Sequence, residues 1–173
     1  MNRPVLTATI RAALAATGAP CGWIVRQTNG ALSVIAVAGD SRATVGQVVS
    51  SDSPAALAIA TGQPASRSIA PDDATARGAG GGDGVPSWLL TVPVGDGDAA
   101  LELAKPSGAT AFGIDDIEIV SLLADIAETA LDATSSPVPD PEALAGELRR
   151  LYLADATRYA VVAAALNSML GAS

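Results

Sequence analysis

The reactive side chains of this 173-residue chain are few, and their types exclude most enzyme chemistry. Histidine is absent, which removes the commonest general base, the usual haem ligand and the usual zinc ligand. The single cysteine, Cys21, can form no internal disulfide and fits no zinc-finger spacing, as is typical of a protein of the reducing cytoplasm. Because no nucleophile can be paired with a base, we expect no catalytic residue and no enzymatic activity.

Carboxylates occur in pairs that could in principle share a proton or a metal ion. Asp72-Asp73 and Asp115-Asp116 both fall where helices are expected to begin, so helix capping accounts for them. Glu102 lies in the otherwise apolar stretch AALELAK, where strand alternation predicts a side chain on the solvent face. We therefore predict no carboxylate site and no metal site.

The glycine-rich stretch at residues 78–84, GAGGGDG, raises the question of phosphate binding. It lacks the glycine spacing of a dinucleotide fingerprint, and the only lysine of the chain, Lys105, lies too far away to complete a Walker loop. A strand is expected after it, so no helix N-terminus faces an anion. Arg67 and Arg77 flank this region and either hold an anion or are solvated charges. The stretch itself is either a lid over a site or a plain connector.

Charge and composition limit the partners. The net charge is −8, and no basic cluster exceeds the pair Arg149-Arg150, so we expect neither nucleic acid nor an anionic membrane as a partner. Apolar residues make up 49% and aromatic residues 3%, which predicts a folded core of Ala, Val, Leu and Ile. Arg11 interrupts the apolar run before Cys21, and no run suits a membrane span. We expect a soluble cytoplasmic protein.

The elements that must position any site are predicted from hydrophobic periodicity and turn residues. Asn29-Gly30 is a strong hairpin signal, Asp52 or Ser53 can cap a helix that starts at Pro54, and Asp115 with Glu118 resembles a capping box. On the last helix, apolar residues are expected to share one face: Ile119, Leu122, Leu123, Ile126, Ala127 and Ala130. In chain order the predicted elements are a helix at 4–17, strands at 21–27 and 31–39, a helix after 53, a strand at 65–70, strands at 87–95 and 99–106, and a helix after 115.

This order predicts an α+β fold with an antiparallel sheet and helices gathered on one face. Several segments in that order resemble the GAF domain, a small-molecule sensing module: GAPCGWIV, GALSVIAVAGDSRATVGQVVS, SPAALAIATGQP, SWLLTVPVGDGDAALELAKP and FGIDDIEIVSLLADIAETAL. The resemblance covers residues 5–133. It implies a GAF-like, PAS-related central sheet, with the N- and C-terminal helices packed on one face and a ligand pocket on the other. The cover of that pocket would run from the middle helix to the strand that begins near Ser87.

We therefore divide the chain into a GAF-like domain at 1–133, a proline-rich linker at 134–141 and a helical tail at 142–173. Compared with the GAF domains that bind cyclic nucleotides, Lys105, Phe112 and Asp116 match the signature, whereas Ala104 and Ile117 depart from it. The resemblance thus implies an ion pair between Lys105 and Asp116 as a structural tie, and it makes a cyclic nucleotide a poor candidate ligand.

No cofactor is predicted, and haem, bilin and zinc are disfavoured. Haem-binding GAF domains use histidine, bilin attachment needs a cysteine in the pocket cover whereas Cys21 opens a strand, and the GAF-type free methionine sulfoxide reductases need paired cysteines.

Ligand-contacting residues are expected near the predicted cover. The candidates are Trp23, Arg77, Ser87, Trp88 and Thr91. Alternation places Ser87 and Thr91 on one face of their strand and Trp88 on the other, but it does not indicate which face is the pocket. Each tryptophan is either a pocket wall or a plain core residue.

The tail carries an apolar lattice of alternating four- and three-residue spacings, typical of a helix that pairs with another helix. Its members are Leu148, Tyr152, Tyr159, Val162, Leu166 and Met169, with Asp155 inside the seam. The tail either folds back on its own domain or pairs with a protein partner or a second copy, and we favour pairing. The whole chain is then interpreted as a non-catalytic sensor of an unidentified small molecule that relays binding through helix-mediated association. The alternative is a ligand-free scaffold for dimerisation or protein interaction.

Overall fold

The computed structural model describes residues 3–69, 86–95 and 97–132, together with short helical pieces of the tail between 146 and 164. Residues 1–131 and 132–173 form two compact units, and each is described by itself. The glycine-rich stretch, Arg77, the pair Asp72-Asp73 and the linker at 134–141 lie outside the described residues, so the predictions made for them stay predictions.

The first unit is built on a six-stranded, fully antiparallel sheet with the strand order β3-β2-β1-β6-β5-β4. Its strands are β1 (Cys21–Thr28), β2 (Ala31–Gly39), β3 (Val48–Val49), β4 (Ala65–Ser68), β5 (Pro86–Val94) and β6 (Ala99–Pro106). The α+β fold with an antiparallel sheet is confirmed. β3 was not predicted, because two residues carry no alternation pattern.

The β1–β2 hairpin turns at Asn29 and Gly30, as predicted. Both residues have positive φ, 51° and 80°, which is the backbone of a type I′ turn and suits the right-handed twist of the flanking strands. Asn tolerates this region better than other residues with a side chain, which explains why the dipeptide fixes the register Thr28↔Ala31.

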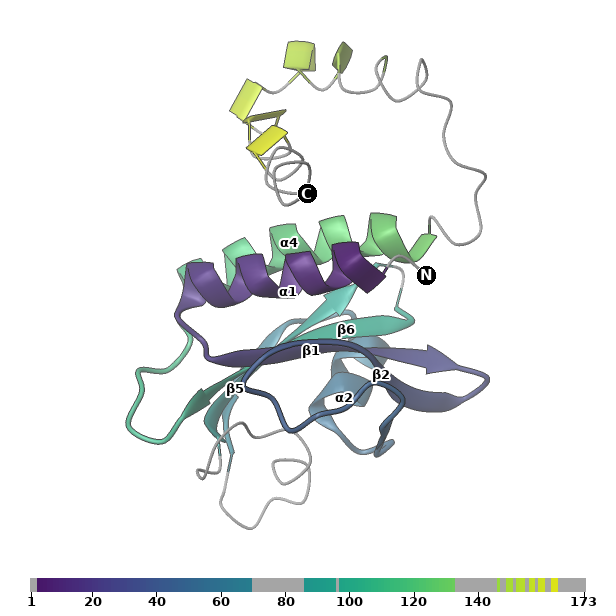
Figure 1. Ribbon diagram of the computed structural model, residues 1–173, viewed down its shortest axis with the longest axis vertical. Coiled ribbons are helices and arrows are strands. Elements are labelled where there is room, and N and C mark those ends of the chain that lie inside the picture. The colour runs from purple at the N-terminus through teal and green to yellow at the C-terminus, as the bar shows by residue number, and fades with distance from the viewer. Residues whose placement is uncertain are drawn as a thin grey trace. The chain divides into compact units, whose positions relative to one another are not determined.

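Two helices, α1 (Arg3–Thr17) and α4 (Ile114–Asp132), lie side by side across one face of the sheet (Figure 1). Leu6, Ile10 and Ala13 of α1 are fully buried against the sheet. The chain is tightly packed at Gly22 of β1, where an added Cβ would lie 2.6 Å from Leu103 Cδ2, 2.9 Å from Glu102 O and 3.1 Å from Ile10 Cγ2. A side chain at residue 22 would therefore clash with β6 and disturb the packing of the sheet beneath α1.

The buried stripe of α4 differs from the predicted one. Ala127 and Ala130 are buried as expected, but Ile119 and Leu122 are 41% and 52% exposed. The buried residues of α4 are mostly smaller: Val120, Ala124, Ala127, Ala130 and Leu131. The predicted Leu123 is partly buried against the same core. A helix lying on a sheet beside a second helix needs small residues for close approach, which explains the valine and alanines at its centre.

The start of α4 also differs from the prediction, by two positions. The helix begins at Ile114, and the Gly113 backbone N–H donates to Asp116 Oδ2 at 3.0 Å. This is the returning half of a capping box, in which the third helical residue accepts from the capping residue. Gly113 therefore stands where Asp115 was predicted to cap the helix, and Asp116 takes the role predicted for Glu118, while Asp115 is exposed in the first turn.

The third helix of the unit, α2 (Pro54–Thr61), covers the opposite face, where it packs on β5 and β6. Ser53 Oγ accepts from the Ala56 N–H at 3.2 Å, and Gly62 ends the helix with a φ of 64°. Of the two predicted capping residues, Ser53 is the one that caps, and Pro54 occupies the first turn, where its missing N–H costs nothing.

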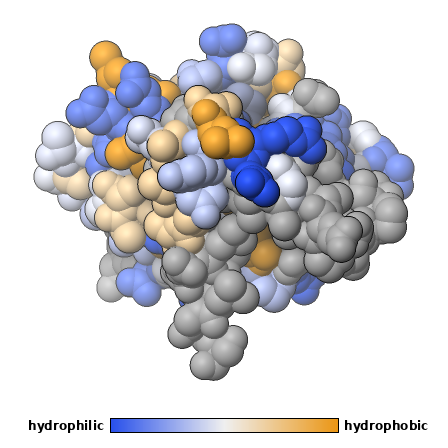
Figure 2. Space-filling view, turned by 90° about the horizontal axis from the view of Figure 1, so that it is seen from above, coloured by the Kyte–Doolittle hydropathy of each residue, from blue (hydrophilic) through white to orange (hydrophobic). Residues whose placement is uncertain are grey.

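Large apolar side chains are exposed at single positions on several elements, among them Val48, Leu57 and Ile114. Figure 2 shows orange hydrophobic residues next to blue hydrophilic ones on the face it views. In the second unit, the rings of Tyr152 and Tyr159 meet edge to face with centroids 5.2 Å apart. Over the described residues, no helix is long and apolar enough to cross a bilayer.

Candidate functional site

The most notable ionisable side chain among the described residues is Glu102, at the middle of β6. Its exposure is 3%, so the predicted position on the solvent face is wrong. β6 lies between β1 and β5 near the centre of the sheet, and residues 99–105 are all buried because helices cover both faces. On such a strand neither face is exposed to solvent, so alternation predicts no exposed residue.

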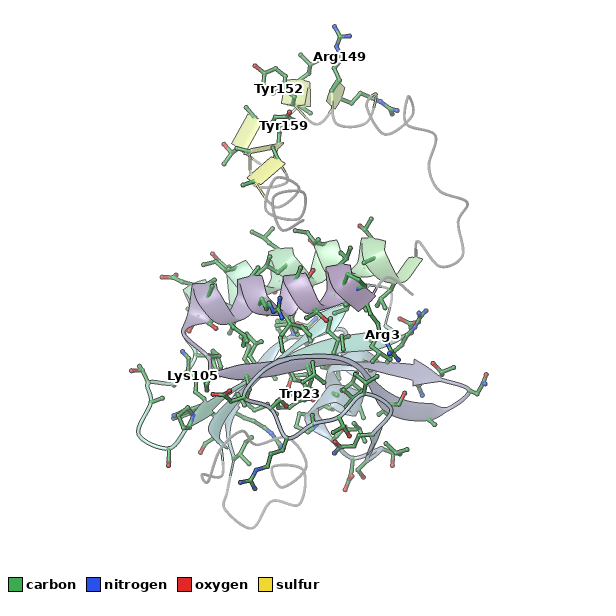
Figure 3. All side chains as sticks on the ribbon, in the orientation of Figure 1. Arg3, Trp23, Lys105, Arg149, Tyr152 and Tyr159 are labelled. Carbon is green, nitrogen blue, oxygen red and sulfur yellow. The ribbon has the colours of Figure 1, made fainter. Side chains whose placement is uncertain are left out.

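Two neutral donors hold the carboxylate, one on each oxygen. Trp23 Nε1 donates to Glu102 Oε2 at 2.6 Å, and Thr91 Oγ1 donates to Glu102 Oε1 at 3.1 Å. Trp23 and Thr91 are themselves 2% and 1% exposed. Figure 3 labels Trp23 on the side of the sheet away from α1 and α4. The three side chains form a buried polar cluster, which we call the Glu102 cluster.

Sheet register explains why these residues meet. Trp23 pairs with Glu102, Glu102 pairs with Thr91, and Thr91 pairs with Ala65, so four strands contribute one straight row. Residues paired across antiparallel strands point to the same face, which brings their side chains within hydrogen-bonding reach. The row runs from buried Trp23 to exposed Ala65 on β4, the edge strand.

Apolar and small side chains surround the cluster on this face. Ala100 and Ala104 flank Glu102 on its own strand, and both are buried. The rest of the face is built mostly from larger apolar residues: Val25, Leu32, Val34, Ile69 and Leu89. Above them α2 contributes Ala55, which is fully buried. The Glu102 cluster is thus a small polar group enclosed in an apolar layer.

Burial raises the pKa of the Glu102 carboxyl above its ordinary value. The hydrogen bonds from Trp23 and Thr91 and the positive charge of Arg67 act in the opposite direction, but burial prevails. Arg67 pairs with Leu89 in the sheet, so its side chain leaves β4 on the face that carries the cluster. Arg67 is exposed, and its positive charge attracts the carboxylate electrostatically from the far side of β5.

The other predicted ligand residues are divided between the two faces. Trp88 packs with the cluster of residues beneath α1 and α4, so the two tryptophans cannot line one site. Ser87 lies in β5, where its backbone alone is described, and Arg77 lies outside the described residues. Trp23 and Thr91 are the two predicted residues that the structure brings together.

The predicted tie between Lys105 and Asp116 is present in the structure. Lys105 Nζ lies 3.5 Å from Asp116 Oδ2 and 4.2 Å from the centre of the Phe112 ring. Lys105 is buried, so the carboxylate and the aromatic face compensate for lost hydration. The tie joins the end of β6 to the start of α4 on the face away from the Glu102 cluster.

A cleft lies at the surface, away from the Glu102 cluster, and involves none of the predicted ligand residues. It is an open cleft of about 330 Å³ between the end of α2, the end of β5 and α4. Its walls include Pro64, Pro93, Ser121, Asp125 and Glu128. Its walls hold acidic side chains but no buried polar group, so the Glu102 cluster remains the better candidate site.

Sequence reasoning missed the residue that organises the site. The signal was available: AALELAK is apolar at every position except Glu102 and Lys105, as expected of a strand covered on both faces. A central strand with both faces covered makes any charged residue within it a buried charge.

The strand order, the helix pair on one face and the single helix on the other define the GAF fold. No model of a protein family and no curated protein matches the sequence. Several solved structures match the greater part of the chain.

The GAF-B domain of DevS from Mycobacterium smegmatis is 22% identical, with 76% of this chain and 93% of that chain covered and a TM-score of 0.60. The GAF domain of a two-component sensor histidine kinase from Bacillus halodurans is 13% identical, with 78% and 96% covered and a TM-score of 0.60. A type II free methionine-R-sulfoxide reductase from Thermoplasma acidophilum is 15% identical, with 76% and 92% covered and a TM-score of 0.60. At such identities the likeness establishes the fold.

Proposed function

We propose that this protein is a non-catalytic, GAF-type sensory module that binds a small molecule on the α2 side of its sheet. The observation that carries the proposal is the Glu102 cluster, a buried carboxylate with two neutral donors in an otherwise apolar layer. Small-molecule sites combine a mostly apolar lining with a few placed polar groups, and the cluster fits that description.

Stability alone does not explain the cluster. Burying a carboxylate is unfavourable, and an apolar residue of similar size at the same position would fill the layer without that cost. A buried charged group that lowers stability is most readily understood as part of a binding site. The GAF domain of a sensor histidine kinase is among the similar structures, which agrees with a sensory role.

We propose that binding is relayed through helices to a protein partner or a second copy of the chain. The tail supplies the tyrosine pair Tyr152 and Tyr159, and Leu153 beside it is 76% exposed. Large aromatic and apolar side chains of this kind are enriched at protein interfaces. The net charge of −8 makes nucleic acid an unsuitable partner, and we place the protein in the cytoplasm without a cofactor.

Catalysis is not part of the proposal, although one similar structure is a free methionine-R-sulfoxide reductase. The chain has one cysteine, and Cys21 is buried in β1. A thiol that must attack a substrate and then be regenerated needs access and a second thiol or another reductant. The purified protein with a thiol reductant should leave free methionine sulfoxide unconsumed.

The second candidate function is a ligand-free scaffold that keeps the sheet and uses its helices for association. The exposed apolar residues Ile114, Ile119 and Leu122 of α4 favour it. In that case the Glu102 cluster would be a conformational lock between strands and would bind nothing.

A thermal-shift screen separates the two functions, because a ligand that binds only the folded state raises the melting temperature. The sensor predicts that a panel of cytoplasmic metabolites contains at least one stabilising compound, and that Trp23→Phe reduces its effect. A panel without a single hit, combined with a crystal structure in which side chains fill the space over Glu102, would leave the scaffold as the function.

A further inference from the structure

We propose that the Glu102 cluster selects a small organic cation, of the amidinium, guanidinium or protonated-amine class, as the ligand of the site. This inference rests on the proposed function and adds the chemical class of the ligand. It stands on the acceptor capacity of the carboxylate, the sheet positions around it and the charge nearby.

Acceptor capacity is the first step. An ionised carboxylate offers about four hydrogen-bond acceptor sites on its two oxygens. Among the described residues, one hydrogen bond reaches each oxygen, from Trp23 and from Thr91. Two acceptor sites are therefore left for donors, which matches the paired N–H groups of an amidinium or guanidinium.

The protein's own donors leave the charge itself uncompensated at close range. Trp23 and Thr91 are neutral, and the cation that acts on the carboxylate is Arg67, one row away and on the other side of β5. Arg67 is exposed, so solvent weakens its attraction for the carboxylate. A ligand cation in contact with Glu102 would supply the missing charge inside the apolar layer.

The residues along the Glu102 row indicate the side from which a ligand would enter. Glu102 is flanked on its strand by Ala100 and Ala104, so the carboxylate stands above its neighbours on the sheet floor. Along its row toward the sheet edge follow Thr91 and then exposed Ala65. The row thus holds no large side chain between Glu102 and the β4 edge, and we take this edge as the side from which a small ligand would enter.

Charge decides between ligand classes. A carboxylate or phosphate ligand would place two negative charges together in an apolar layer, where like charges repel strongly. A neutral ligand could use the free acceptor sites but would leave the carboxylate charge uncompensated. A cation satisfies both requirements, so it should bind better than a neutral or anionic compound of the same shape.

The test uses two series of probes that keep shape and change charge. One series is benzamidinium, benzamide and benzoate, and the smaller one is acetamidinium, acetamide and acetate. Binding of each to the full chain is measured by calorimetry at millimolar concentrations and neutral pH. We expect binding of at least one amidinium, with its amide and its carboxylate clearly weaker.

Variants assign the binding to the carboxylate. Glu102→Gln keeps the size and an acceptor for Trp23 but removes the charge, and it should weaken amidinium binding by about thirtyfold or more. Glu118→Gln, the same change at an exposed position of α4, should leave binding unchanged. Arg67→Gln should strengthen amidinium binding about two- to fivefold, because a repelling charge is removed.

The approach route has its own pair of variants. Ala65→Leu narrows the edge of the row and should weaken amidinium binding. Ser68→Leu lies on the same edge strand but on the opposite face, where it pairs with Trp88, and should have no effect. Equal effects of the two variants would contradict approach along this row.

Each outcome bears on a different claim. Binding of the amide or the carboxylate as tightly as the amidinium, or undiminished binding by Glu102→Gln, would overturn the cation class while leaving a small-molecule sensor in place. Absence of binding by all six probes would also overturn it, and the metabolite screen described above would then decide the proposed function separately.

Discussion

Glu102 meets two hydrogen-bond partners of different character. The Trp23 indole N–H can only donate, whereas the Thr91 hydroxyl can donate to an ionised carboxylate or accept from a protonated one. The cluster therefore accommodates either protonation state without moving a strand. A ligand cation would favour the ionised state, and burial favours the neutral one.

The raised pKa of Glu102 predicts how stability changes with pH. Between the pKa of glutamate in the unfolded chain, about 4.3, and the raised folded pKa, the folded state holds more protons than the unfolded state. Glu102 therefore costs the wild type stability as pH rises through that window. Glu102→Gln has no titratable group at this position. Its free energy of unfolding should match that of the wild type at about pH 4 and exceed it increasingly toward neutral pH. Urea unfolding of both proteins across this range measures the difference, and a constant difference would contradict the buried-carboxylate account.

Trp23→Phe should destabilise the protein by about 1 to 3 kcal/mol at neutral pH, because the buried Glu102 Oε2 loses its donor. Part of that loss comes from the smaller ring. A double-mutant cycle with Glu102→Gln isolates the hydrogen bond, and we expect a coupling free energy of about 1 kcal/mol. Additive effects of the two changes would mean that the bond contributes nothing.

At the residue scale, the sequence predicted Trp23 and Thr91 as candidates but assigned Glu102 to the solvent. Each strand was read singly, and a single strand cannot show that β1 and β5 flank β6 or that helices cover both of its faces. Trp88 and Trp23 lie on opposite faces for a related reason. The face on which a residue lies, relative to a residue of another strand, depends on the register between the strands.

At the scale of elements, caps and turns fix the helices and hairpins, and the tie between β6 and α4 fixes how helix and sheet meet. Asp116 does two things there: it accepts from the Gly113 N–H and pairs with Lys105. One short side chain thus starts α4 and compensates a buried cation.

Asp116→Ala should therefore lower the free energy of unfolding by about 2 kcal/mol or more, since it removes a cap and leaves Lys105 buried without its carboxylate. Asp115→Ala, the same change at the exposed neighbouring position, should cost about 0.5 kcal/mol or less. Denaturant unfolding of the two variants gives the comparison, and equal losses would mean that the tie is not a stabilising contact.

Most elements were predictable because local signals agreed with the final structure. The Asn29-Gly30 turn, Ser53 before Pro54 and Gly62 after the helix each have a local physical reason. The stripe of α4 was not predictable in the same way, because the choice of Val120 and Ala124 over Ile119 depends on the space that the sheet and α1 leave. That space is a property of the assembled layers.

At the scale of the whole molecule, a compact unit of residues 1–131 is followed by a helical unit that carries both tyrosines of the chain. We propose that this second unit mediates association, so the oligomeric state should depend on its tyrosine pair. The double substitution Tyr152→Ser with Tyr159→Ser should shift the full chain from dimer to monomer in light scattering.

The control for that experiment is Ala154→Ser, an exposed position two residues beyond Tyr152 and so on another side of the helix. It should leave the mass unchanged. A wild-type chain that is monomeric at all concentrations would contradict the homodimer. Association with a different protein would then be the remaining proposal.

The most direct test of the account follows the two indole N–H signals of the chain by NMR during a titration with benzamidinium. Trp23 and Trp88 are its only tryptophans and lie on opposite faces of the sheet, and Trp88→Phe assigns the pair. The account predicts that the Trp23 signal shifts in a saturable manner and that the Trp88 signal stays in place. A shift of the Trp88 signal alone, or no shift of either, would contradict a cation site at Glu102.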